Sequence, residues 1–333
     1  MTMNNMLQIE LWRECNNHCK FCYLQEENKK QSEEYKLNAI KNAIEIIRNN
    51  QTWTNYDSLG LIGGEFFQGQ LNTEALNEEF FSMFVAIEDQ FLHSNIKHFW
   101  LTMSLTNTQH IYNSFTFEHF IDSLDHLACI RSNKHVSWKN EENQDIWICT
   151  SYDTIGRFHT KESEETWKHY MKIIKDRSEY IHTTTCFIIT QDLIDTYNKD
   201  KDFFNKFREE YNTHIYFKCP DIGCNDKTIE DFTKRTKLNN FFPKRADFIS
   251  FLTDLIKDND YKDLFNREYR AATLYENIGG DKLRVFKERQ NDLISAEDTT
   301  SPCGHAYWYS RYIDSDKCMM CDRDTVFKEI EDE

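Results

Sequence analysis

Three cysteines close to the N-terminus have the spacing in this chain that most directly indicates chemistry. Cys15, Cys19 and Cys22 lie within eight residues in the stretch LWRECNNHCKFCYLQ, immediately after a short apolar run. Cysteine thiolates hold iron–sulfur clusters, and a [4Fe–4S] cube usually takes four of them. Three thiolates on one loop therefore predict a cube with three corners bound and one iron open to a non-protein ligand.

A structural zinc ion is the main alternative for these cysteines. Such an ion takes four protein ligands in a closed tetrahedron, and His18 lies within the loop as a fourth ligand. The histidine fits poorly at this spacing, and a chance arrangement of thiols is the remaining alternative. The spacing therefore favours an iron–sulfur cluster.

The motif Cys15-x3-Cys19-x2-Cys22, with the aromatic Phe21 before its last cysteine, resembles the signature of the radical S-adenosylmethionine (SAM) superfamily. The resemblance covers roughly residues 7–220 and implies a partial barrel with the cysteine loop after its first strand. It implies two cofactors, a [4Fe–4S] cluster and SAM, and it places Phe21 among the cofactor-binding residues. SAM would bind the open iron, and its reductive cleavage would give a 5′-deoxyadenosyl radical that abstracts hydrogen from a substrate.

Hydrophobic periodicity predicts that strands and helices alternate six times over about 220 residues. The predicted strands cover 6–12, 57–65, 96–107, 145–153, 181–190 and 213–220, and the helices between them cover 33–50, 73–91, 114–127, 163–180 and 193–211. Such alternation is typical of parallel strands joined by right-handed crossovers. The expected fold is therefore α/β: a partial (β/α)6 TIM-like barrel with a mostly helical, cysteine-containing C-terminal extension.

The predicted alternation of strands and helices ends near residue 225. We expect a radical SAM barrel over 1–224 and a helical extension over 225–333, ending in an auxiliary cluster or zinc lobe. Residues 226–295 are charged and are predicted to be mostly helical, and a short hairpin is expected near the C-terminus.

Polar and glycine-rich stretches follow the predicted strands, where the active sites of parallel β/α barrels lie. Gly63, Gly64 and Glu65 follow the second strand, and glycine lets a backbone approach a ligand closely. The family resemblance implies that this turn bonds the methionine amine of SAM. The chain has Phe66 where the family usually has proline, so the turn differs from the family's pattern there.

The third strand ends in Ser104, Thr106 and Asn107. They resemble a Thr-Asn-Gly of the family that lines the cofactor pocket, although Thr108 replaces the glycine. Polar residues that merely end a strand are the equal alternative.

The fourth strand ends in Ser151 and Asp153, with Arg157 close behind. They resemble a Ser-x-Asp of the family in which the serine approaches the ribose or carboxylate of SAM. A guanidinium suits bidentate binding of a carboxylate, so Arg157 could contact SAM or could simply pair with Asp153.

A second set of cysteines lies near the C-terminus: Cys303, Cys318 and Cys321. They resemble the auxiliary-cluster lobe of SPASM and twitch radical SAM enzymes, with Cys219 or Cys224 available as a fourth ligand. A zinc site that uses His305 or Cys224 is an alternative, and free thiols are another.

Composition limits the class of protein. The chain has 333 residues, 39% of them hydrophobic, and a formal net charge of −16, which argues against general nucleic-acid binding. No stretch approaches the roughly 20 apolar residues of a membrane span, and no signal peptide is visible. We therefore expect a cytoplasmic protein whose eleven cysteines are reduced.

These features together predict a radical SAM enzyme that acts on a peptide or protein. One alternative is modification of a nucleotide or other small metabolite, and a second is a non-catalytic iron–sulfur or zinc scaffold. The enzyme would need an electron donor such as flavodoxin or ferredoxin. No residue is assigned to the substrate-side chemistry, although Cys186 and Cys219 are placed to reach the barrel mouth.

Overall fold

The computed structural model describes most of the chain up to residue 257 and short parts beyond it. The described residues are 6–15, 17–22, 30–54, 56, 58–65, 73–93, 96, 98–106, 117–134, 146–158, 160–222, 226–257, 273–275, 284–286, 312–317 and 319–331.

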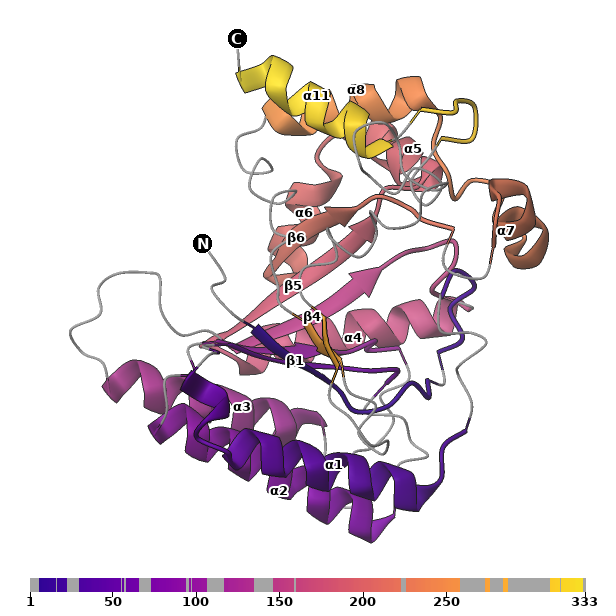
Figure 1. The fold of residues 1–333 in the computed structure, drawn as a ribbon. Helices are drawn as coiled ribbons and strands as arrows, with labels where there is room; N and C mark the ends of the chain where they lie inside the picture. Colours follow the sequence, from indigo (N-terminus) through magenta and orange to yellow (C-terminus); the bar gives the residue numbers. More distant parts are fainter. Residues whose placement is uncertain are drawn as a thin grey trace.

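Six parallel strands form one sheet, in which spatial order follows sequence order (Figure 1). They are β1 (Met6–Glu10), β2 (Ser58–Ile62), β3 (His98–Thr102), β4 (Ile146–Tyr152), β5 (Ile181–Ile188) and β6 (Thr213–Lys218). The sheet is open, with β1 and β6 as its outer strands. The predicted α/β class and the predicted alternation of strands and helices are confirmed.

Helices connect these strands, and α1, α2 and α3 lie together on one side of the sheet (Figure 1). The connecting helices are α1 (Glu33–Arg48), α2 (Glu74–His93), α3 (Phe117–Lys134), α4 (Lys161–Arg177), α5 (Gln191–Lys199) and α6 (Phe203–Tyr211). The single helix predicted over 193–211 was wrong, because α5 and α6 are separate. Residues 198–202, NKDKD, contain no apolar side chain that could hold a continuous helix against the core.

Side-chain caps place several helix starts close behind the strands. Thr190, two residues after β5, accepts a hydrogen bond from the Leu193 N–H and begins α5. Ser32 and Thr160 cap α1 and α4 in the same way. A cap of this kind contributes about 1 kcal/mol to helix stability, and these caps fix where the loops at the carboxyl end of the sheet must turn.

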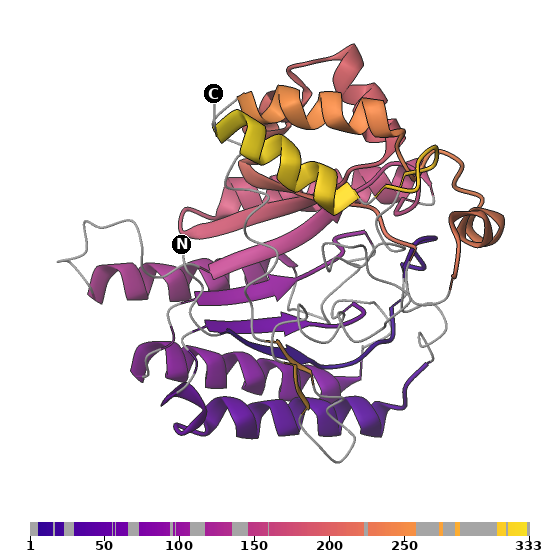
Figure 2. The ribbon, with the colours of Figure 1, turned by 45° about the horizontal axis from the view of Figure 1, so that its top comes forward.

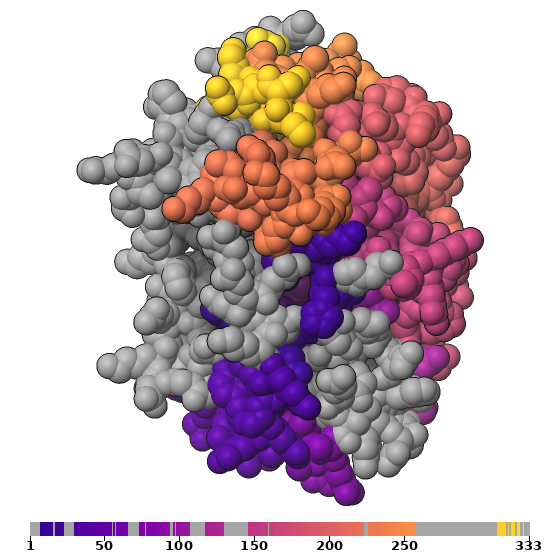
Figure 3. Space-filling model, turned by 90° about the vertical axis from the view of Figure 1, so that its right-hand side faces the viewer, coloured from indigo at the N-terminus to yellow at the C-terminus, as the bar shows by residue number. Residues whose placement is uncertain are grey.

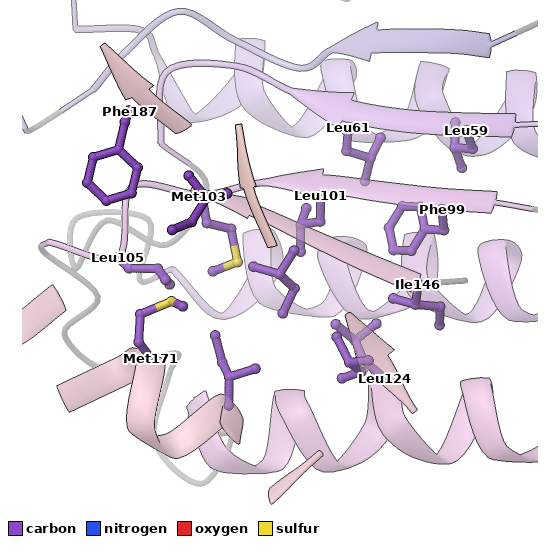
Figure 4. Packing of buried hydrophobic residues seen from close by; sticks show 14 of the residues in the cluster. Leu59, Leu61, Phe99, Leu101, Met103, Leu105, Leu124, Ile146, Met171 and Phe187 are labelled. Carbon is purple, nitrogen blue, oxygen red and sulfur yellow. The ribbon is translucent and has the colours of Figure 1, made fainter. Parts of the chain in front are cut away.

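The main core lies between the sheet and the helices (Figure 4). Alternate strand residues such as Leu59, Leu61, Phe99 and Leu101 are fully buried on this face. Met171 of α4 belongs to the same buried cluster. This period of two is the pattern of a sheet with one face packed on helices.

The opposite face of the sheet carries a row of stacked rings. Trp100 and Trp147, which are paired across β3 and β4, have ring centroids 4.9 Å apart and an interplanar angle of 8°. Trp147 also stacks on His182 of β5, at 4.9 Å. These spacings match the distance between neighbouring strands, so the rings form a ladder across the sheet on the side away from the helices.

The described part of the C-terminal extension contains α7 (Ile229–Thr236), α8 (Arg245–Lys257) and α11 (Met319–Glu331). It also contains an antiparallel pair, β7 (Thr273–Tyr275) and β8 (Arg284–Phe286), so the expectation of a mostly helical 226–295 was wrong there. The β-branched and aromatic residues of TLY and RVF favour strand. The hairpin expected near the C-terminus falls partly outside the described residues.

The last helix, α11, packs beside α8 (Figure 2). The guanidinium of Arg245 donates two hydrogen bonds to the Asp322 carboxylate, at 2.7 and 2.9 Å. Phe248 and Met319 belong to the same buried cluster as the sheet. The boundary predicted at residue 224 stays a prediction, but the described parts on its two sides share one core. Among the described helices, none has both the length and the apolar character needed to cross a membrane.

Candidate functional site

The cysteine loop and the Gly63-Gly64-Glu65 turn run side by side beyond the ends of β1 and β2. The Gly64 N–H donates to the Trp12 carbonyl (2.8 Å), and the Glu65 N–H donates to the Glu14 carbonyl (3.1 Å). The indole Nε1 of Trp12 donates in turn to the Glu65 carbonyl (3.0 Å). The ladder between the two strands therefore continues into both loops and holds the Gly-Gly-Glu turn beside the cysteines.

Gly64 permits this close approach because it has no side chain. A Cβ at this position would lie 2.0 Å from the Glu14 carbonyl oxygen and 2.7 Å from the Arg13 carbonyl oxygen. The sequence predicted that glycine here lets the backbone approach a ligand. The structure gives Gly64 a different partner, the backbone of the cysteine loop.

A buried ion pair anchors the beginning of the same loop. The Lys36 Nζ of α1 lies 2.7 Å from the Glu14 carboxylate, and both side chains are buried. The same carboxylate oxygen accepts a hydrogen bond from the Gln31 N–H (2.9 Å). The cysteine loop is thus held by β2 on one side and by α1 on the other.

The three thiols of the loop are not disulfide-bonded, and two of them accept hydrogen bonds from one asparagine. The backbone N–H of Asn17 donates to the Cys15 sulfur (3.4 Å), and its side-chain Nδ2 donates to the Cys19 sulfur (3.0 Å). Asn17 is buried. Sequence reasoning missed this residue, although an amide between two cysteines of one loop is a natural donor to both sulfurs.

Burial is the main cause that opposes ionisation of Cys15 and Cys19 in the protein itself. Burial, together with the nearby Glu65 carboxylate, raises the pKa of Cys15 to about 12. Burial raises the pKa of Cys19 to about 11, although the Arg157 guanidinium acts in the opposite direction. A metal or cluster must therefore displace protons from these thiols when it binds.

His18 does not complete a tetrahedral site with the cysteines. Its side chain is exposed, and its backbone has a φ of 46° in the left-handed region. Across the described parts of the chain, no three His, Cys, Asp or Glu side chains gather as one metal ion would require. A cluster binds each thiolate to a different iron, so its ligands need not converge on one point.

Glu65 connects the end of β2 to the end of β3. One of its carboxylate oxygens accepts hydrogen bonds from the backbone N–H of Ser104 (2.7 Å) and from the Ser104 hydroxyl. Thr106 donates to the same hydroxyl (3.1 Å). Glu65 and Ser104 are both buried, so the structure brings these two predicted site residues together.

Asp153 and Ser151 lie at the end of β4. One Asp153 oxygen accepts from the backbone N–H groups of Ile155 (2.9 Å) and Gly156 (2.8 Å), which turns the chain sharply after the strand. Burial raises the pKa of Asp153, and the two N–H donors oppose that shift. Ser151 pairs with Cys186 across β4 and β5, on the face that carries the aromatic ladder.

Arg157 enters the same region from the turn after β4. Its Nη2 donates to the Ser104 carbonyl (3.3 Å), and its charge acts on the Cys19 thiol. Its Nε is buried and has no hydrogen-bond partner among the described residues. Buried donors are nearly always paired in proteins, and an acceptor on a bound ligand could pair with this N–H.

Phe21 packs toward the C-terminal extension. Its ring stacks on Phe241 at 5.4 Å, and a Cβ at Gly156 would lie 2.4 Å from it. The Lys20 N–H donates to the Gly156 carbonyl (2.9 Å). The cofactor contact predicted for Phe21 stays a prediction, and no sequence signal pointed to Phe241.

We expect Gly156→Ala to displace the Phe21 ring and to loosen the cysteine loop. The substitution should lower the iron retained after reconstitution by about half, because the new methyl group and the ring cannot share the space. The double variant Gly156→Ala/Phe21→Ala should recover most of that iron. Anaerobic iron analysis of both variants measures the effect, and equal losses in the two would contradict this packing.

The second set of cysteines is only partly described. Cys219, just after β6, is not disulfide-bonded, but Cys321 of α11 is. The expectation that the cysteines are reduced was therefore wrong for Cys321. Burial is the main cause that raises the pKa of Tyr312, and the nearby Asp322 and Cys219 raise it further. Tyr312 therefore lies between Cys219, at the end of β6, and Asp322 of α11. Asn107, Cys224, Cys303 and Cys318 lie outside the described residues.

The chain matches no family model and no curated protein.

Proposed function

We propose that this protein is a radical SAM enzyme. One arrangement carries the proposal: a loop with three thiols that are not disulfide-bonded lies beside the Gly-Gly-Glu turn and beside the buried Nε of Arg157, which has no partner among the described residues. These groups come from three different strand ends, which are the usual place for an active site in parallel β/α folds. The sequential strand order and the helices along the sheet support the finer reading of a partial (β/α)6 barrel.

The residues present fit a [4Fe–4S] cluster and SAM. Cys15, Cys19 and Cys22 would hold three irons, and Asn17 would donate to two of the sulfurs. Reductive cleavage of SAM at such a cluster supplies a 5′-deoxyadenosyl radical that abstracts a hydrogen atom.

The other site residues would orient SAM. The Arg157 guanidinium would donate to its carboxylate, and the Gly63–Glu65 turn would bond its amine. Ser104 fixes Glu65, and the Asp153 turn fixes Arg157. Ser151 faces the ligand side of the sheet.

A zinc scaffold is the less favoured reading of the same residues. The exposed His18 and the absence of convergence among the described ligands both count against a closed tetrahedral ion.

Anaerobic reconstitution tests the proposed function. Iron, zinc and sulfide are counted per chain, SAM and dithionite are added, and 5′-deoxyadenosine is measured. About four irons for each cluster together with 5′-deoxyadenosine are expected. A protein that holds zinc but no iron, or whose intact cluster cleaves no SAM with or without peptide, would contradict the proposal.

Arg157→Ala should weaken SAM binding without removing the cluster. Loss of a charge-assisted, buried pair predicts a SAM Kd about 10- to 100-fold higher, with unchanged iron. Arg157→Lys should recover only part of the affinity, because an ammonium lacks the planar fork. Equilibrium dialysis under anaerobic conditions measures this, and Arg177→Ala, an exposed arginine paired with Asp122, is the control.

We also propose a second metal site in the C-terminal extension, either an auxiliary [4Fe–4S] cluster or zinc. The support is that Cys219 and Asp322 both act on Tyr312 and so lie near it. Cys321 is disulfide-bonded, so it would bind a metal only after that disulfide is reduced. Cys318, Cys303 and Cys224 would complete the ligand set.

Replacing Cys318 and Cys321 with alanine should remove about four irons or one zinc per chain. The spectrum of the first cluster should stay unchanged, because the two sites use different loops. Metal analysis and electron paramagnetic resonance check this. Unaltered metal content would show that these thiols bind no metal.

The proposed substrate class is a peptide or protein. An acidic chain of net charge −16 suits a basic peptide through charge complementarity. A nucleotide or small metabolite is the alternative, and a screen that measures substrate-dependent 5′-deoxyadenosine with both classes separates the two.

A further inference from the structure

A basic segment interrupts the acidic surface of this protein. Residues 227–245 carry six Lys or Arg side chains and only two acidic ones, in a chain whose net charge is −16. Lys227, Lys237 and Lys244 are exposed and take part in none of the ion pairs found among the described residues. The segment therefore presents positive charge that the protein does not neutralise.

This segment lies against the cysteine loop. The Arg235 guanidinium of α7 donates to the Lys20 carbonyl within the loop (3.2 Å), and Phe241 stacks on Phe21. Figure 3 shows α7, in orange, directly beside the indigo N-terminal segment on one face of the molecule. Lys20 is itself exposed. The basic segment thus contacts the loop that carries the three thiols.

The structure assigns to this basic patch, formed by Lys20, Lys227, Lys237 and Lys244, the docking of a small acidic electron-carrier protein. The inference rests on the proposed function, because a radical SAM cluster must be reduced by an external one-electron donor. Complementary charge raises the association rate and orients the encounter. The acidic remainder of the chain would repel the same partner, so the patch also selects where it binds.

Charge reversal tests the patch. In Lys227→Glu/Lys237→Glu both changes lie on exposed side chains that flank α7 and touch no thiol. The matched control is Lys199→Glu/Lys257→Glu, which makes the same change at two exposed lysines. Lys199 ends α5 and Lys257 ends α8. The end of α8 lies about 18 Å along the helix from the patch.

Two readouts use the reconstituted full chain. The first is binding of an acidic flavodoxin, measured at low and at high salt. The second is the rate at which the prereduced flavodoxin bleaches the visible absorbance of the cluster. Dithionite-driven formation of 5′-deoxyadenosine is measured in parallel, because a small inorganic reductant does not need the patch.

At low ionic strength the patch variant should bind flavodoxin at least tenfold more weakly than wild type, and flavodoxin should reduce its cluster at least tenfold more slowly. Both differences should shrink as the salt concentration rises. Dithionite-driven cleavage should stay equal, and the control variant should behave as wild type. Equal flavodoxin binding by wild type and patch variant would overturn the docking proposal, as would an equal loss in the control. If wild type cleaved no SAM with dithionite, the proposed function would be overturned instead. The flavodoxin-binding assay would still test whether the basic patch docks an acidic electron carrier.

Discussion

Replacement of Cys15, Cys19 and Cys22 with alanine should remove about four irons per chain and abolish formation of 5′-deoxyadenosine. The three sulfurs are free thiols on one loop, and no other described cysteine lies in that loop to replace them. Each single variant should lose most of the activity, because a cube with two protein ligands loses its orientation relative to Arg157 and Glu65. Iron analysis and an anaerobic SAM-cleavage assay measure both effects.

Cys129→Ala is the matched control for this series. Cys129 lies in α3, outside the cysteine loop, and is not disulfide-bonded. The control should retain its iron and its activity within the error of the assays. Retained SAM cleavage in the triple variant would rule out the central assignment, and an equal loss in Cys129→Ala would show that the effect comes from instability alone.

The sequence predicted the sheet well because parallel strands buried by helices have strong local signals. The alternating apolar residues of 57–65 and 96–107, and the helical periodicity of 33–50, each match an observed element. The break between α5 and α6 was missed because the helical spacing of apolar residues is interrupted by only five polar and charged residues, 198–202. The β7–β8 pair was missed because three-residue strands carry almost no pattern.

The candidate site was predictable only in part. Spacing along the chain identified the cysteines, the Gly-Gly-Glu turn and Arg157, which all follow strand ends. It could not identify the contact of Phe21 with Phe241 or that of Lys20 with Arg235. These contacts join residues that are more than 200 positions apart, and only the packing of the extension against the loop creates them. The sequence also did not predict that Gly64 lies against the Glu14 carbonyl, whereas the predicted approach of this turn to a ligand stays a prediction.

Gly64→Ala should separate the Gly-Gly-Glu turn from the cysteine loop. The new Cβ would lie 2.0 Å from the Glu14 carbonyl oxygen, and two backbone segments cannot give way as a flexible side chain can. The two loops must move apart and weaken the hydrogen bonds from Gly64 to Trp12 and from Glu65 to Glu14. Overpacking costs about 1–3 kcal/mol, and each weakened hydrogen bond costs about 1 kcal/mol more.

The free energy of unfolding of the metal-free protein should therefore fall by about 3–5 kcal/mol, as measured by urea denaturation. In the reconstituted protein the SAM Kd should rise at least tenfold, because Glu65 would no longer lie beside Cys15. Trp12→Phe is the control, since it removes the indole bond to the Glu65 carbonyl without adding an atom. Because Trp12 is buried, the lost bond costs about 1 kcal/mol in addition to the cavity that the smaller ring leaves. The two variants are therefore compared by the SAM Kd, which should rise less in Trp12→Phe. If Gly64→Ala were no more harmful than Trp12→Phe, the close approach of the two loops would not hold the site together, and the Gly-Gly-Glu turn would have to act through contact with a ligand instead.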